Sequence, residues 1–198
     1  MDEWVPPRVR ALPRDEHDHP IPWWTPTTGG VPDWRGFSAG RLLDALRHEL
    51  CWTCGIRRGA VSAVILTGPT LLSRLSTEPP SHTTCAEYAA RACPFLTGTT
   101  PPREGLVRPV VAVWATRDTE TYPTGDGGLV VRAGPAEHVT WWRAGRPATY
   151  EDADAAITAG WAHLTALTDS SATLAHLDGR RIEAAAALPE PTIVNPHA

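Results

Sequence analysis

The chain has 198 residues and a formal net charge of −4, and 42% of its residues are hydrophobic and 20% charged. These proportions are typical of a globular protein and exclude a chain that is disordered throughout. The 18 basic residues are all arginine, so mechanisms that need a Schiff-base or P-loop lysine are excluded. The acidic balance also argues against a protein that binds nucleic acid with its whole surface.

Residues 1–36 are rich in proline and tryptophan, as in HPIPWW and PDWRG. Proline at this density opposes regular helices and strands, so we expect an extended arm whose tryptophans dock on the body. His19, Trp23 and Trp24 of this arm are candidates for a binding surface. The opening MDEWVPPRVR lacks the apolar core of a signal peptide, and no apolar run is long enough to span a bilayer. We therefore expect a cytoplasmic protein without membrane contact.

Residues 37–95 are predicted to form a helix followed by a metal-binding core. FSAGRLLDALRHEL (37–50) has leucines at spacing four and Ser38 as its cap. AVSAVIL (60–66) and LLSRL (71–75) flank a Gly-Pro pair, which predicts a hairpin. TTCAEYAARAC (83–93) is predicted to be helical up to Pro94, with Thr84 and Glu87 as a capping box and Cys85 in the first turn.

Residues 106–168 are predicted to form a small antiparallel sheet and a long helix. The expected strands 110–116, 129–133 and 137–142 are joined by turn-like segments and favour a three-stranded meander. TYEDADAAITAGWAHLTAL (149–167) is an amphipathic helix capped by Thr149. Residues 169–198 are a C-terminal tail with one short helix and a proline-rich end. The predicted fold class is thus α+β.

Cysteine and histidine form the strongest functional pattern of the chain. Cys51 and Cys54 are a C-x-x-C pair followed by Gly55, and His82 and Cys85 stand at spacing three at a helix start. Residues at that spacing share one helix face, so each pair can direct two ligands at one ion. Four nitrogen and sulfur ligands in a tetrahedral array suit Zn²⁺. We predict that these four residues bind zinc.

The order of knuckle, hairpin and helix with the second ligand pair resembles the treble-clef zinc finger, over residues 51–93. The longer pattern CWxCG…EPPSHxxCAEYAAxxCPFL is also similar to a family of uncharacterised proteins of bacteria and their phages. That likeness implies a shared architecture and no established activity. The HNH nucleases share the treble-clef frame, but residues 55–81 contain no histidine, aspartate or asparagine, which argues against their chemistry.

Cys93 is a candidate additional ligand. It stands eight residues after Cys85, about 12 Å along an intact helix, which is too far to share one metal ion. A buried apolar role, an axial thiolate to haem from the Cys93-Pro94 pair, and an iron–sulfur cluster using all four cysteines remain open.

The centre of the chain is its basic part, because residues 51–117 hold seven arginines and three glutamates. Arg57 and Arg58 follow the knuckle directly and are candidates for a binding surface. The sequence favours a cytoplasmic zinc-stabilised binding protein that contacts nucleic acid or a protein partner. The alternative is a metalloenzyme, with haem, an iron–sulfur cluster or an open zinc site, that acts on a small molecule.

Overall fold

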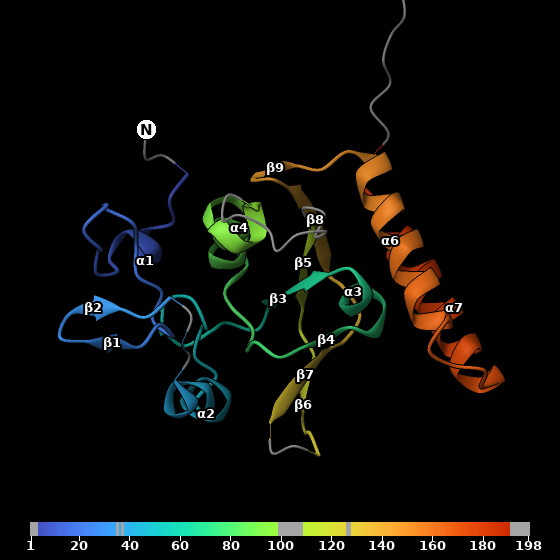
Figure 1. Cartoon of the computed structure of the whole chain (residues 1–198), viewed down its shortest axis with the longest axis horizontal. Coiled ribbons are helices and arrows are strands. Elements are labelled where there is room, and N and C mark those ends of the chain that lie inside the picture. The colour runs from blue at the N-terminus through green and yellow to red at the C-terminus, as the bar shows by residue number, and fades with distance from the viewer. Residues whose placement is uncertain (1–3, 35, 37, 99–108, 126–127, 191–198) are drawn as a thin grey trace, which may run out of the picture.

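Figure 1 shows the computed structural model, which describes residues 4–34, 36, 38–98, 109–125 and 128–190. Its centre is a four-stranded antiparallel sheet in the order β3-β5-β8-β9. These strands are β3 (Ser62–Thr67), β5 (Val110–Thr116), β8 (His138–Arg143) and β9 (Arg146–Pro147). The mixture of helices with small antiparallel sheets confirms the α+β class.

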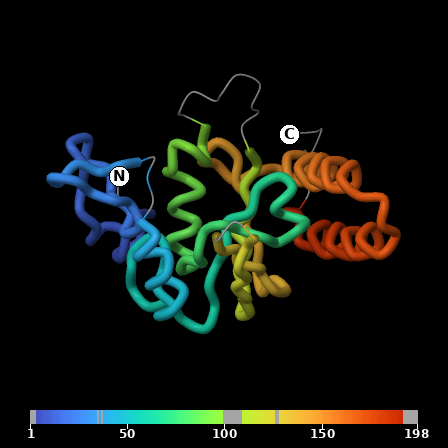
Figure 2. The backbone as a smooth tube through the Cα atoms, turned by 60° about the horizontal axis from the view of Figure 1, so that its bottom comes forward, coloured from blue at the N-terminus to red at the C-terminus, as the bar shows by residue number. Residues whose placement is uncertain are grey.

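The central sheet is covered on both faces, as Figure 2 shows with α4 on one side and α6 and α7 on the other. One face packs against α3 (Pro69–Ser73), α6 (Tyr150–Thr165) and α7 (Ser171–Ala185), and Trp114 and Ile157 lie in this core. The other face packs against α4 (Thr83–Ala92), where Ala86 and Ala90 meet Val111 and Val113. Alternate residues of β5 therefore enter two different cores, as the pleat of a strand requires.

A smaller sheet has the order β4-β7-β6, with β4 (Leu75–Ser76), β6 (Thr119–Pro123) and β7 (Leu129–Ala133). The remaining elements are α1 (Pro7–Arg10), the paired strands β1 (Thr27–Thr28) and β2 (Val31–Pro32), α2 (Ala39–Arg47) and α5 (Pro94–Thr97). None of the helices in the described ranges is both long and apolar enough to cross a membrane.

Two predicted helix starts are confirmed by their caps. The Ser38 hydroxyl accepts a hydrogen bond from the Arg41 amide at the start of α2. At the start of α6, Thr149 and Asp152 form a reciprocal capping box. The apolar stripe of α6 faces the larger core as expected, with Ala153 and Ile157 buried.

The predicted hairpin between 60–66 and 71–75 is wrong. β3 pairs along its whole length with β5, and the residues after Gly68 turn into the short helix α3. Pro69 at the first helical position favours that turn, and the apolar β3 gains two covered faces by joining the central sheet.

The predicted meander of 110–116, 129–133 and 137–142 is also wrong. β5 lies between β3 and β8, whereas β7 pairs with β6 and β4 in the other sheet. Six of the seven residues of β5 are buried, so this strand needs a neighbour on each edge and a helix on each face. β6 was expected to be part of a turn.

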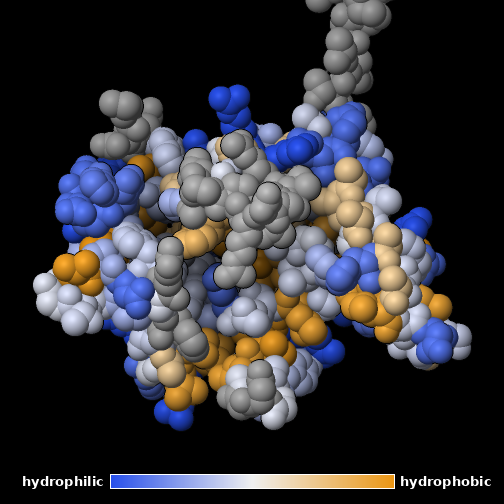
Figure 3. Space-filling view, viewed as in Figure 1, coloured by the Kyte–Doolittle hydropathy of each residue, from blue (hydrophilic) through white to orange (hydrophobic). Residues whose placement is uncertain are grey.

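The two ends of the chain carry more regular structure than expected. The proline-rich segment 1–36 contains α1 and the β1–β2 pair, and the segment after 168 contains the 15-residue α7. The proline-rich end of the predicted tail, 191–198, lies outside the described residues, as do 1–3 and 35 of the predicted arm. Figure 3 shows apolar residues at the surface over the region of α6 and α7. The side chains of Leu167 and Ile182 are exposed.

Candidate metal centre

The first ligand pair lies in a tight knuckle that the backbone closes. Cys51 N–H donates to Ile56 O at 2.8 Å, and Gly55 N–H donates to Cys51 O at 2.8 Å. Gly55 has a φ of +72°, a left-handed conformation that side chains other than glycine rarely adopt. This turn brings the thiols of Cys51 and Cys54 to the same side of the loop.

The second pair lies at the start of α4, with His82 as the N-cap residue and Cys85 in the first turn. The residues just before α4 are tied to the knuckle and to the central sheet. Trp52 N–H donates to Pro80 O at 3.2 Å, and the backbone of Ser81 forms a β-bridge with Ala63. These contacts carry His82 and Cys85 to the two knuckle cysteines, 28 or more residues earlier in the chain.

The predicted capping box of Thr84 and Glu87 is wrong. α4 begins at Thr83, and the side chain of its N-cap residue, His82, makes no capping hydrogen bond. That ring is directed at the cysteines instead, and the Glu87 carboxylate accepts a hydrogen bond from Thr140 of β8 at 3.4 Å. The start of α4 therefore lacks a side-chain cap, because the side chain of its N-cap residue lies in the cysteine cluster.

The four side chains form a compact cluster that fits a tetrahedral ion. Their ligand atoms all lie within 4.8 Å of one another. The Nδ1 atom of His82 is 3.5 Å from Cys54 Sγ and 3.9 Å from Cys85 Sγ. Tetrahedral Zn²⁺ with bonds of about 2.3 Å to sulfur and about 2.0 Å to nitrogen would separate these atoms by about 3.5 Å. The residues present can hold a metal ion, and the donor set suits zinc.

The cluster is closed to solvent. The exposed fractions of Cys51 and Cys85 are 0%, and those of Cys54 and His82 are 7% and 9%. Val9 of α1, also 0% exposed, packs against the three cysteines, so the N-terminal segment forms one wall of the centre. All cysteines of the chain are free thiols.

Hydrogen bonds favour the thiolate of Cys51 and orient the His82 ring. Hydrogen bonds from the Cys54 and Cys85 side chains and from the amides of Cys54 and His82 hold the pKa of Cys51 far below its usual range. His82 Nε2 lies 3.1 Å from Arg57 O, and a proton on Nε2 leaves Nδ1 free as the ligand atom. An outer hydrogen bond of this kind orients a ligating imidazole.

Cys93 does not lie in this cluster. It follows the last residue of α4, which is intact over Thr83–Ala92, and caps the start of α5. Burial raises the pKa of its thiol. The structure thus places Cys93, which is partly exposed, at the end of α4 that is far from the cluster.

The other predicted site residues lie at different places. Trp23 covers Gly55, where an added Cβ would come within 2.5 Å of its ring, and Trp24 stacks on Trp52 with ring centroids 5.8 Å apart. His19 is an exposed residue beside Asp15, in a turn of the N-terminal segment. The residue pair Arg57 and Arg58 lies on the outgoing side of the knuckle, where Arg58 N–H donates to Glu49 O at 2.8 Å.

The surface has two hollows that the sequence patterns did not predict. One, of about 370 Å³, joins Arg57 and Arg58 to Arg117. The other, of about 410 Å³, is lined by the aromatic residues Trp4, Tyr88 and Trp142 and by arginines that include Arg91. Each hollow joins chain segments that are far apart in the sequence: residues 49–62 meet 117–119 in the first, and residues 4–10 meet 84–91 and Trp142 in the second.

Comparisons of the chain with protein-family models, with curated proteins and with solved structures find no match. The resemblance to the treble clef and to a phage family therefore rests on the motifs alone. In the structure, the knuckle and the helix of that resemblance are present, and the hairpin between them is replaced by β3, α3 and β4.

Proposed function

We propose that the chain is a zinc-stabilised binding protein in which Cys51, Cys54, His82 and Cys85 hold one structural Zn²⁺. The observation that carries this proposal is a buried cluster of four nitrogen and sulfur donors from two local elements. Four protein ligands complete a tetrahedral shell and leave no position for a substrate, which is typical of structural rather than catalytic zinc.

The metal would join parts of the chain whose shared apolar core is small. α1, the knuckle and α4 meet at the cluster, where Val9 packs against the three cysteines, and Val5, Leu12 and Tyr88 are only partly buried around them. Binding of structural zinc is coupled to folding, so the ion supplies free energy that this small core does not. Three cysteines that form no disulfide also favour a reducing compartment such as the cytoplasm.

The partner in this proposal is nucleic acid or another protein, bound on the surface beside the knuckle. Of the treble-clef pattern, the proposal uses only the knuckle and the following helix that carries the second ligand pair. A metalloenzyme that uses iron remains the rival reading, and metal identity separates the two.

The test is elemental mass spectrometry of freshly purified protein together with thermal unfolding. We expect about one zinc per chain and no stoichiometric iron. Cys54→Ser should lose the metal and its cooperative unfolding transition, whereas the matched control Cys93→Ser should keep both, because Cys93 lies outside the cluster. A Cys54→Ser protein with unchanged zinc content and Tm, or wild-type protein that contains iron, would overturn the proposal.

A further inference from the structure

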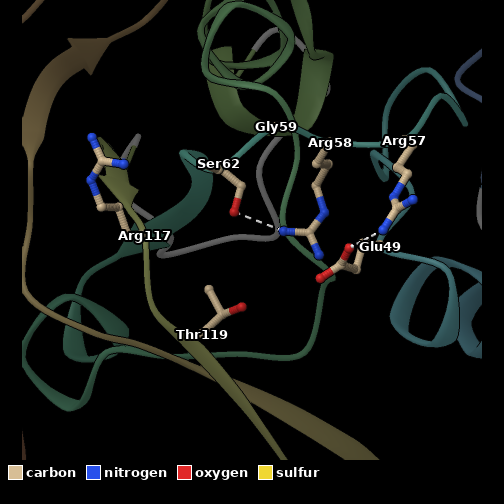
Figure 4. A pocket seen from close by; sticks show the side chains of 8 residues that line it. Glu49, Arg57, Arg58, Gly59, Ser62, Arg117 and Thr119 are labelled. Carbon is tan, nitrogen blue, oxygen red and sulfur yellow. Dashed lines mark hydrogen bonds and ion pairs between the residues drawn. The ribbon is translucent and has the colours of Figure 1, made fainter.

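A polar hollow of about 370 Å³ lies beside the knuckle. Figure 4 shows the guanidinium groups of Arg57 and Arg58 on one side and Arg117 on the other, with the hydroxyl groups of Ser62 and Thr119 between them. Glu49 is the only acidic residue among those that line it. The hollow therefore gathers positive charge and hydroxyl donors at one place.

The strand register brings these residues together. Ser62, the first residue of β3, is paired with Thr116, the last residue of β5. The chain segment that enters β3 carries Arg57 and Arg58, and the segment that leaves β5 carries Arg117. The hollow thus lies at the ends of two paired strands of the central sheet and is not formed by one loop alone.

The charges of the three arginines are compensated unequally. Arg57 pairs with Glu49 at 3.0 Å, and Arg117 pairs with Glu137 at 3.2 Å. All four of these side chains are about half or more exposed, so the pairs are weak and can exchange with another anion.

Arg58 differs from the other two. Its guanidinium donates a hydrogen bond to a neutral group, the Ser62 hydroxyl, at 2.7 Å, and it forms no ion pair with any residue in the described ranges. Its Nε atom is buried without a hydrogen-bond partner, and burial lowers the pKa of its guanidinium, while the nearby Glu49 and Cys51 compensate that effect in part. A bound anion would compensate this charge.

We propose that this hollow binds a backbone phosphate of a nucleic acid strand. Guanidinium groups match phosphate oxygens with paired hydrogen bonds, and the hydroxyls of Ser62 and Thr119 add neutral donors. The lining contains no aromatic side chain on which a base could stack. The contact therefore positions the strand without reading its sequence.

The second hollow favours a nucleic acid over an acidic protein segment. Trp4 stacks on Tyr88 with ring centroids 5.2 Å apart, and the Arg91 guanidinium lies 4.1 Å from the Trp4 ring. Trp4 is exposed and Tyr88 half-buried, and arginine beside accessible aromatic rings is typical of surfaces that bind single strands, because bases stack on such rings. Carboxylates of a peptide would gain nothing from these rings.

The inference rests on the proposed function, since the metal centre positions the arginines. The Arg57 carbonyl accepts the hydrogen bond from His82 Nε2 at 3.1 Å, so one ligand of the zinc holds the segment that carries two of the three guanidinium groups. Loading of the metal and shape of the hollow are linked through this contact.

The test is fluorescence anisotropy of a labelled single-stranded DNA of mixed sequence, titrated with zinc-loaded protein at several salt concentrations. Arg58→Gln should raise Kd about ten-fold, the size expected for one charged hydrogen-bonding partner. It should also reduce the slope of log K against log salt by about 0.7. Arg117→Gln, on a different element, should act in the same direction. The control Arg146→Gln changes the same charge at an exposed site on β9 and should change Kd less than two-fold.

Zinc content and Tm are measured for each variant, so the two proposals can fail separately. Zinc-loaded wild type that binds no DNA, or DNA binding that neither Arg58→Gln nor Arg117→Gln weakens, would overturn the phosphate site and leave the structural zinc intact. Binding of inorganic phosphate without DNA, or equal binding of a polyglutamate peptide, would also overturn the nucleic acid assignment. Wild type without zinc would instead overturn the proposed function.

Discussion

Replacing Gly55 with alanine tests whether the N-terminal segment is locked onto the knuckle. Gly55 has a φ of +72°, and an added Cβ would lie 2.5 Å, 2.5 Å and 2.8 Å from three atoms of the Trp23 ring. The left-handed conformation alone costs a residue with a Cβ about 1–2 kcal/mol. The Trp23 backbone is held at this place by the hydrogen bond from its amide to Thr53 O at 2.8 Å, so the ring can give way only by rotating about its side-chain torsions. We expect a total loss of about 2–4 kcal/mol in unfolding free energy.

The measurement is chemical denaturation of zinc-loaded protein, followed by far-ultraviolet circular dichroism, with tryptophan fluorescence as a second probe. Gly59→Ala is the matched control, because Gly59 has no positive φ and no atom within 4 Å of an added Cβ. Gly59→Ala should change the free energy of unfolding by less than about 0.5 kcal/mol. A loss of no more than about 1–2 kcal/mol in Gly55→Ala, which the left-handed φ alone explains, would refute the contact between Trp23 and the knuckle.

Two further predictions concern the two ends of the structure. Val9→Ala should remove about 1–3 kcal/mol of stability and speed the transfer of zinc to a chelator, because Val9 is fully buried against the cysteines. A chelator transfer rate equal to that of wild type would contradict this packing. Ile157→Ala should cost about 2–5 kcal/mol in a denaturant titration, since Ile157 of α6 is 3% exposed in the larger core, and zinc content should not change. Unaltered stability would place α6 outside that core.

The metal cluster was predictable because each half of it is local. The spacing of Cys51 and Cys54 sets a knuckle, and the spacing of His82 and Cys85 sets one face of a helical turn. The rest of the fold is needed only to bring the two ligand pairs together. The hypothesis of one shared metal ion already predicts that they come together. The caps of α2 and α6 were predictable for the same reason, since a cap involves residues three positions apart.

The strand pairing was not predictable from local patterns. β3 and β5 are separated by α3, β4, α4 and α5, and the pattern of each strand says only that it is buried, not which strand lies beside it. A Gly-Pro pair between two apolar runs is compatible with a hairpin and also with the start of a short helix. The helix forms here because β3 pairs with the buried strand β5 and not with the residues that follow Gly68. The hollow beside the knuckle was missed as a consequence, because the pairing of Ser62 with Thr116 creates it.

The metal centre is part of the fold and not an appendage to it. α4 carries two of the four ligand residues at its first turn, and its Ala86 and Ala90 lie in the core beneath the central sheet. The Ser81 backbone, one residue before His82, bridges to β3, which in turn pairs with β5. A shift of α4 on metal loss would therefore disturb one face of the sheet as well as the knuckle. Because the ends of β3 and β5 also support the arginine hollow, loss of the proposed zinc should disturb the sheet and the hollow together.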